Sequence, residues 1–252
     1  MFQRLLIFPC LCVSLAMAQD PAPEPPKPVG GSPAAVAEPS VKKLDDNRFQ
    51  IGEVVFDKKT REIRFPAQIN MIEGQLEYLI VNEKGKLHES LLSTKISPTH
   101  LNLAFTLLRF KPSRELYPLP NDTGGTSDKF PEVSAEIKAG ARILIEVEWA
   151  EEGKTKRLPI NDWIQHGEKT TPMPAGPWVY GGSEVEDGKY APETSGDIVA
   201  IYLSLAAIVN YPGDDNNNDD VWTPFPKRVP AVDTPVTVII KPATPAKSPE
   251  KP

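Results

Sequence analysis

Apolar and polar residues alternate along much of the chain, with the period of two that is typical of half-buried β-strands. Turn sequences such as residues 57–60 and 82–85 separate the apolar runs, and short turns of this kind join neighbouring antiparallel strands. The strands predicted in this way are 52–56, 61–65, 75–81, 86–92, 143–149, 155–158, 178–180, 197–203 and 236–240.

One segment has the period of a helix instead of a strand. Leu101, Phe105 and Leu108 recur at helical spacing, and Ser97 followed by Pro98 is a typical helix start. Apolar residues lie on most sides of this segment, which predicts that the helix is buried. We therefore expect an α+β fold, a mostly antiparallel β-sheet with one principal buried helix.

Three other segments depart from the strand pattern. Residues 112–140 hold scattered prolines and a Gly-Gly pair, which predicts a long irregular loop. A helical turn is expected at 159–164 and a short helix at 204–209.

The two ends of the chain have a different composition. Residues 1–18 combine a basic residue, an apolar run and a small-x-small motif, which predicts a secretory signal peptide, with an uncleaved anchor as the alternative. Residues 19–44 are rich in proline and predict a disordered tether, and residues 242–252 predict a disordered tail. The remaining residues, 45–241, are expected to form a single domain.

Cysteine content and charge exclude several chemistries. Cys10 and Cys12, the two cysteines, lie in the predicted signal peptide, so cleavage after Ala18 leaves no thiol for disulfides, catalysis or metal binding. The chain has 28 Lys and Arg residues against 34 Asp and Glu residues, a net charge of -6 that argues against nucleic-acid binding. The sequence indicates no cofactor, and no membrane span once the signal peptide is removed.

Several distinctive stretches are spread along the folded part of the chain. They are residues 70–74, 76–79, 85–92, 98–100, 178–183, 195–200, 221–223 and 235–240. Together they resemble the YdjY-domain family of bacterial proteins, and the resemblance covers nearly all of residues 45–241. It implies an exported protein, periplasmic or secreted, whose activity is not established.

His88, Glu89 and Ser90 form the most specific of these stretches and are candidate binding residues. On a regular strand, His88 and Ser90 would share one face and Glu89 would point to the other. The alternatives are backbone hydrogen bonding at the end of the sheet, or an envelope hydrolase, with or without a metal held also by His100. No nucleophile-elbow or zinc-binding motif surrounds these residues, so we assign no catalytic residue and no metal.

A second candidate is the segment of Trp178, Tyr180, Gly181, Gly182 and Ser183. Aromatic side chains beside accessible backbone are common in binding clefts, because a rigid ring buries a large area at low entropic cost. Packing of the same rings in the core is the alternative.

The acidic run at 214–220 offers many oxygen atoms, which are the ligands that calcium prefers. It lacks the spacing of an EF-hand loop, so a solvated loop is favoured over a calcium-stabilised structural protein.

These observations favour a non-catalytic ligand-binding or accessory module of the bacterial envelope. Its partner would be a small molecule or an envelope component. The expected binding surface joins the end of the His88 strand to the segment at 178–183.

Overall fold

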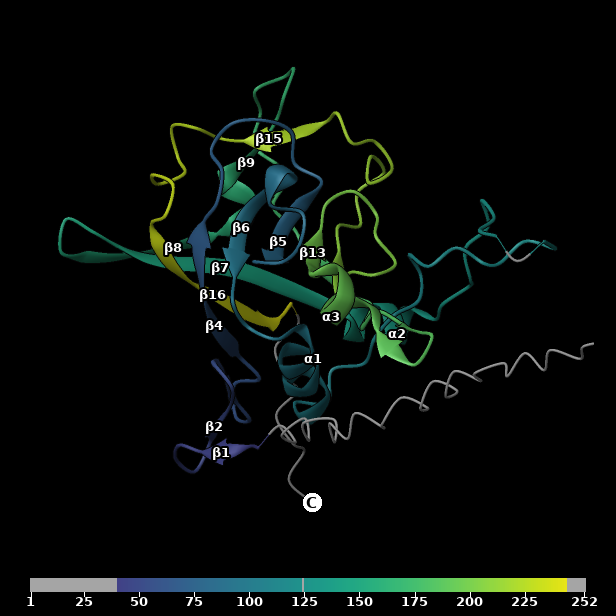
Figure 1. The fold of residues 1–252 in the computed structure, drawn as a ribbon, viewed down its shortest axis with the longest axis horizontal. Helices are drawn as coiled ribbons and strands as arrows, with labels where there is room; N and C mark the ends of the chain where they lie inside the picture. Colours follow the sequence, from purple (N-terminus) through teal and green to yellow (C-terminus); the bar gives the residue numbers. More distant parts are fainter. Residues whose placement is uncertain (1–39, 124, 244–252) are drawn as a thin grey trace, which may run out of the picture. The chain divides into compact units, whose positions relative to one another are not determined.

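The strands of the main sheet close into an eight-stranded barrel (Figure 1). The computed structural model describes residues 40–123 and 125–243, so the predicted signal peptide and most of the predicted tether and tail lie outside the described residues. In spatial order, with β6 returning to β4, the barrel strands are β4 (Ile63–Ile69), β16 (Pro235–Pro242), β7 (Arg142–Glu151), β10 (Trp178–Tyr180), β14 (Val209–Asn210), β13 (Asp197–Ala200), β5 (Tyr78–Asn82) and β6 (Ser90–Thr94).

The barrel is mixed rather than simply antiparallel. β5 pairs with β6 and β13 pairs with β14 in parallel, whereas the other barrel pairs are antiparallel. The prediction of a mainly β fold with few helices is therefore confirmed, and most of the pairs are antiparallel, but the sheet is a closed mixed barrel rather than a simple antiparallel sheet. Alternation along a strand predicts which side chains face inward, and it carries no information on the direction of the neighbouring strand.

Further strands extend and flank the barrel. At two points the paired backbone reaches beyond the predicted domain limits: Lys42 lies in a strand inside the predicted tether, and Pro242 ends β16 inside the predicted tail. The flanking strands are β1 (Lys42–Lys43), β2 (Arg48–Ile51) and β3 (Val54–Asp57) beside β4, β8 (Lys154–Pro159) beside β7, β9 (Ile164–His166) paired with β15 (Trp222–Pro224), and β11 (Val185–Glu186) paired with β12 (Lys189–Tyr190).

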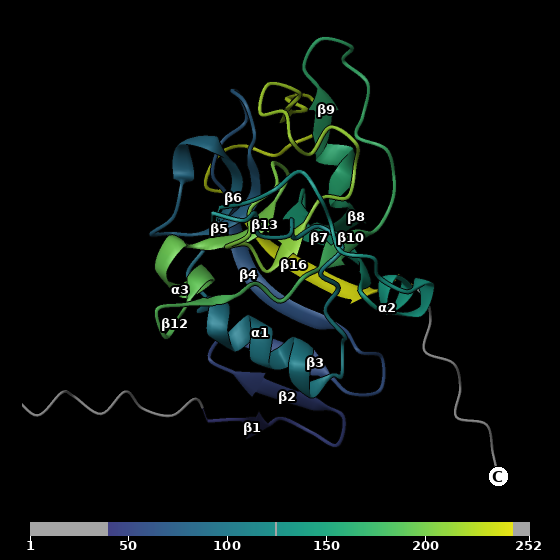
Figure 2. The ribbon, with the colours of Figure 1, turned by 90° about the vertical axis from the view of Figure 1, so that its right-hand side faces the viewer.

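Helix α1 (Pro98–Leu107) is the predicted helix, and it packs against β3 and α3 (Ala191–Ser195) (Figure 2). The Ser97 hydroxyl accepts a hydrogen bond from the backbone N–H of His100, which satisfies one of the free amides at the helix start. Leu101 and Phe105 are fully buried, whereas Leu107 is exposed, so the helix has one solvent-facing side.

The short helical elements agree with the sequence in part. A 3-10 turn, η2 (Ile160–Trp163), occupies the predicted helical turn. The helix expected at 204–209 is wrong, since the side chain of Asn210 instead bonds both the N–H and the C=O of Ser204 and holds a turn there. The long segment at 112–140 contains a helix, α2 (Ala135–Gly140), which Ser134 caps.

Side chains alternate across the barrel wall as the sequence predicts. On β7, Ile143, Ile145 and Val147 point into the core, while Glu146 and Glu148 are half-buried on the outer face. The interior is filled by aliphatic and aromatic side chains from every barrel strand, so it is a packed core.

Glu115 anchors the irregular residues before α2 onto the barrel. Its side chain, 9% exposed, accepts two hydrogen bonds from Arg142, the shorter of 2.5 Å, and lies 3.4 Å from Lys138 of α2. Partial burial alone would raise the pKa of Glu115, but the bonds and positive charges of Arg142 and Lys138 outweigh it and lower the pKa.

The seam between β4 and β6 closes the barrel. β4 pairs with β3 at Ile63 and Arg64 and with β6 at Gln68 and Ile69, which leaves residues 65–67 without a strand partner on that edge. Pro66 has no N–H to lose there, and its carbonyl accepts a bond of 2.6 Å from the Thr94 hydroxyl. A side chain thus replaces a missing ladder bond.

Thr94→Val should lower the free energy of unfolding by about 1–2 kcal/mol, because the isosteric valine cannot donate to the Pro66 carbonyl. Urea denaturation measures the change. The matched control is Thr155→Val on exposed β8, expected within about 0.5 kcal/mol of wild type. Equal stability of the two variants would contradict the role of Thr94 at the seam.

Glu115→Gln should cost about 1–2 kcal/mol at neutral pH, because it removes the charge that Arg142 and Lys138 bond. The folded-state pKa of Glu115 lies below its unfolded value, so the stabilisation is complete above the unfolded pKa and is lost as pH falls through the folded pKa. Denaturation of both proteins from pH 7 to pH 3 should show the gap closing towards acid. A gap independent of pH would contradict the ion pairing.

Candidate functional site

The predicted group of His88, Glu89 and Ser90 does not form a catalytic arrangement. Residues Leu87–Glu89 form a 3-10 turn, η1, so the predicted strand at 86–92 is wrong in its first half. The His88 side chain is 80% exposed and lies 3.5 Å from the Glu89 carboxylate. Ser90 is fully buried and donates its hydroxyl hydrogen to the Lys86 carbonyl at 2.5 Å. A nucleophile must bond its base, and no such bond joins Ser90 to His88 among the described residues.

The aromatic residues of the second predicted group belong to the core. Trp178 is fully buried, and its indole N–H donates to the Asn161 side chain at 3.3 Å. Tyr180 stacks on Phe105, with 4.2 Å between ring centroids, and donates to the Asn102 side chain at 2.8 Å. Burial raises the pKa of Tyr180 to about 12, so the phenol stays protonated.

The backbone that follows is equally engaged. The N–H groups of Gly181 and Gly182 both donate to the carbonyl of Ile208, and the Ser183 hydroxyl donates to carbonyls at 205 and 206. A Cβ at Gly181 would lie 2.5 Å from the Tyr117 ring, which explains why glycine is needed there. Trp178, Tyr180 and Ser183 are buried, so they supply little surface to join the exposed His88 side chain in one binding site.

A polar cluster that sequence reasoning missed lies next to Glu89, and we call it the buried polar cluster because Tyr78 and Asp197 are each 2% exposed. Lys86 reaches it from the surface, with its side chain 47% exposed. The Lys86 ammonium lies 2.6 Å from the Tyr78 hydroxyl and 3.9 Å from the Glu89 carboxylate. Asp197, 2% exposed, accepts a bond of 2.9 Å from the Ser204 hydroxyl, and its other oxygen has no partner in the described structure. The cluster ties the turn at 204 to the barrel wall. In the sequence, this cluster is indicated only by Asp197, the charged residue that begins the apolar run 197–203.

The concave site richest in aromatic side chains is a groove of about 460 Å³, which we call the aromatic groove. A larger hollow of about 690 Å³, beside Arg61 and Arg109, has no aromatic side chain in its lining. The aromatic groove gathers residues from β9 and the following turn, from the loop after β14, and from β15. Its lining residues are His166, Lys169, Thr171, Pro172, Pro174, Tyr211, Asp214, Asp215 and Trp222.

Three rings form the apolar part of the aromatic groove. The pairing of β15 with β9 places Trp222 directly opposite His166, and their ring centroids are 5.8 Å apart. The rings of Tyr211 and Trp222 meet edge to face, with 5.9 Å between their centroids. The Tyr211 ring also contacts the Trp178 ring, with 5.5 Å between centroids. The indole N–H of Trp222 is buried and has no hydrogen-bond acceptor in the described residues.

The charged groups of the aromatic groove come from opposite elements. The turn after β9, closed by a bond from Thr170 N–H to the His166 carbonyl, carries Lys169. The loop after β14 carries Asp214 and Asp215. Burial, together with the negative charges of Asp215 and Asp214, raises the pKa of Tyr211 to about 12. Lys169 and the two aspartates form no ion pair within 4.0 Å in the described part of the chain.

The oxygen atoms of the acidic run do not converge on a cation. Asp220 accepts a bond of 2.8 Å from Gln75, and the Asn218 side chain accepts from the Asp220 N–H. Asn216 bonds the Tyr211 carbonyl and holds the loop against β14. Within residues 40–123 and 125–243, no three His, Cys, Asp or Glu side chains are placed to hold a metal.

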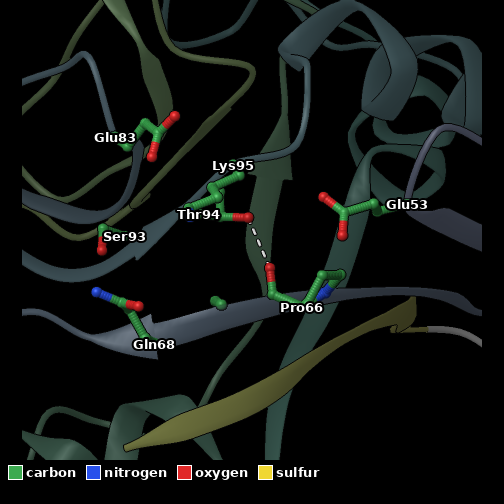
Figure 3. A pocket seen from close by; sticks show the side chains of 8 residues that line it. Glu53, Pro66, Gln68, Glu83, Ser93, Thr94 and Lys95 are labelled. Atoms are coloured by element: carbon green, nitrogen blue, oxygen red, sulfur yellow. Dashed lines mark hydrogen bonds between the residues drawn. The ribbon is translucent and has the colours of Figure 1, made fainter. Parts of the chain in front are cut away.

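A second hollow of about 160 Å³ lies at the barrel seam (Figure 3). The carboxylates of Glu53 and Glu83 lie on either side of the bond between Thr94 and Pro66 in this view. All three charged residues that line it, with Lys95 the third, are exposed, and no aromatic side chain contributes. Its smaller volume and its lack of aromatic side chains make it the weaker candidate.

A comparison with family models identifies the chain. Residues 54–241 match the YdjY domain. The chain belongs to the YdjY domain family. This confirms the resemblance that the distinctive stretches indicate. No curated protein and no solved structure matches the chain.

Three of the stretches that carry the YdjY resemblance meet in space although they are far apart in the sequence. Residues 76–79, 85–92 and 195–200 supply Tyr78, Lys86 and Asp197 of the buried polar cluster. The stretch 221–223 supplies Trp222 to the aromatic groove. No described helix of this YdjY domain has the length and apolar character needed to cross a membrane.

Tyr180→Ala should destabilise the YdjY domain by about 3–5 kcal/mol, because it removes a buried ring stacked on Phe105. His88→Ala should change stability by less than about 0.5 kcal/mol, because that side chain lies in solvent. Thermal and urea denaturation distinguish the two. A fully stable Tyr180→Ala variant would mean that this segment is a surface and not core.

Proposed function

We propose that this YdjY domain is an exported, non-catalytic binding module that holds a small molecule or an envelope component in the aromatic groove. One observation supports this assignment above others: one hollow of about 460 Å³ is lined by three aromatic rings and by three charged side chains that have no ion-pair partner among the described residues. Small-molecule sites have volumes of roughly 300–1,000 Å³ and combine apolar walls with a few polar groups.

The sites outside the aromatic groove give less support to a catalytic function. The Ser90 hydroxyl is buried and already donates to a carbonyl, so it has no route to a substrate. In the buried polar cluster, burial is the largest influence on the Tyr78 hydroxyl, and it raises the pKa of Tyr78. A phenol with a raised pKa is a poor general base near neutral pH.

Export is the second part of the proposal, and it is carried by the amino-terminal sequence. A basic residue, an apolar run and a small-x-small motif precede the folded part. An exported protein meets molecules outside the cytoplasm, so the ligand is one of these.

The binding proposal predicts that a ligand changes the Trp222 indole signal selectively. The full chain, labelled with 15N at its 4 tryptophans, is titrated with amino acids, short peptides, sugars, amines and organic acids. We expect at least one compound to shift the Trp222 indole resonance saturably. The resonance of Trp163, whose N–H also has no partner among the described residues but which does not line the groove, should not move.

A blocking variant provides the control for this titration. Thr171→Arg fills the aromatic groove from its rim and should abolish the shift, whereas Thr155→Arg on β8 should leave it intact. If no compound shifts Trp222 selectively, the aromatic groove is not a binding site and the proposal fails.

A further inference from the structure

We infer that the ligand of the aromatic groove is a zwitterion, a free amino acid or short peptide whose ammonium and carboxylate contact opposite walls. This inference rests on the proposed binding function and specifies its ligand class. It follows from the placement of charges in the groove and from the aromatic rings that line it.

The two signs of charge are separated by element. Lys169 projects from the turn that follows β9, and the same turn holds the His166 ring through a bond from the Lys169 N–H to Nδ1 at 3.4 Å. Asp214 and Asp215 project from the loop that follows β14. One wall of the hollow is therefore cationic and the other is anionic.

These charges do not neutralise each other. In the described residues, no N···O distance of 4.0 Å or less joins Lys169 to either carboxylate, although all three line the same hollow. A ligand with a single charge would satisfy one wall and leave the other unpaired. A ligand with an ammonium and a carboxylate satisfies both, and charge-assisted hydrogen bonds of this kind are about twice as strong as neutral ones.

The apolar part of the groove fits the body of such a ligand. Tyr211 and Trp222 stand nearly perpendicular, at 82°, and Tyr211 is only half-buried, so ring surface remains for an aliphatic or aromatic side chain. A volume of about 460 Å³ accommodates an amino acid or a dipeptide.

Matched ligands test the requirement for both charges. Each amino acid in a panel is compared with its decarboxylated amine and its deaminated acid, and dipeptides with blocked and free ends are included. Titrations of the full chain follow the Trp222 indole resonance. We expect at least one zwitterion to bind tenfold or more tightly than both of its singly charged partners. The comparison of free amino acids with dipeptides identifies which source of the zwitterion is preferred.

Charge variants assign each end of the ligand to a wall. Asp215→Asn should weaken the zwitterion and the amine about tenfold and leave the acid unchanged. Lys169→Met should weaken the zwitterion and the acid and leave the amine unchanged. Asp128→Asn and Lys129→Met, exposed residues outside the groove, are the matched controls and should change nothing.

The outcomes separate the inference from the proposed function. If a sugar or a singly charged compound shifts Trp222 and no zwitterion binds more tightly, the groove is a binding site but the inference is wrong. If no compound of any class shifts Trp222, both are wrong. Loss of zwitterion binding in Asp215→Asn and Lys169→Met, with the controls intact, supports both.

Discussion

Closure of the barrel at the β4–β6 seam is the constraint on which the rest of the structure depends. The two strands pair at Gln68 with Ser93 and at Ile69 with Leu92. Ile69 and Leu92 are both fully buried, so a slip of one residue would turn them out of the core. The buried side chains thus fix the register, and the Thr94 hydroxyl completes the hydrogen bonding where the strands diverge.

The aromatic groove depends on the barrel through its supporting layer. Tyr211 follows β14 directly. Its ring contacts the ring of Trp178, a core residue on neighbouring β10. Trp222 and His166 belong to the separate pair of β9 and β15. Directly after β15, the Phe225 N–H donates to the carbonyl of the core residue Trp163. Trp178, a candidate binding residue in the sequence, therefore does not line the aromatic groove but supports Tyr211, which does.

Much of the fold could be predicted from the sequence, and the site could be predicted only in pieces. Alternation located most strands, and Ser97 with Pro98 located the start of α1, because these signals are local. The parallel pairs and the barrel closure were missed, since strand direction and partners depend on contacts distant in sequence. His166, Trp222 and the acidic run are each visible in the sequence, but their meeting in one groove follows from the pairing of β9 with β15.

Strand β8 has a consequence for how copies of this protein meet one another. It pairs with β7 on one side, and no described strand covers its other edge. An antiparallel approach of two such edges centred on Thr155 would set Lys154 of one copy opposite Lys156 of the other. Like charges facing each other across strands are destabilising, and lysine on an open edge is a known defence against sheet extension. The two lysines of this edge therefore disfavour pairing of two copies through β8 in that register.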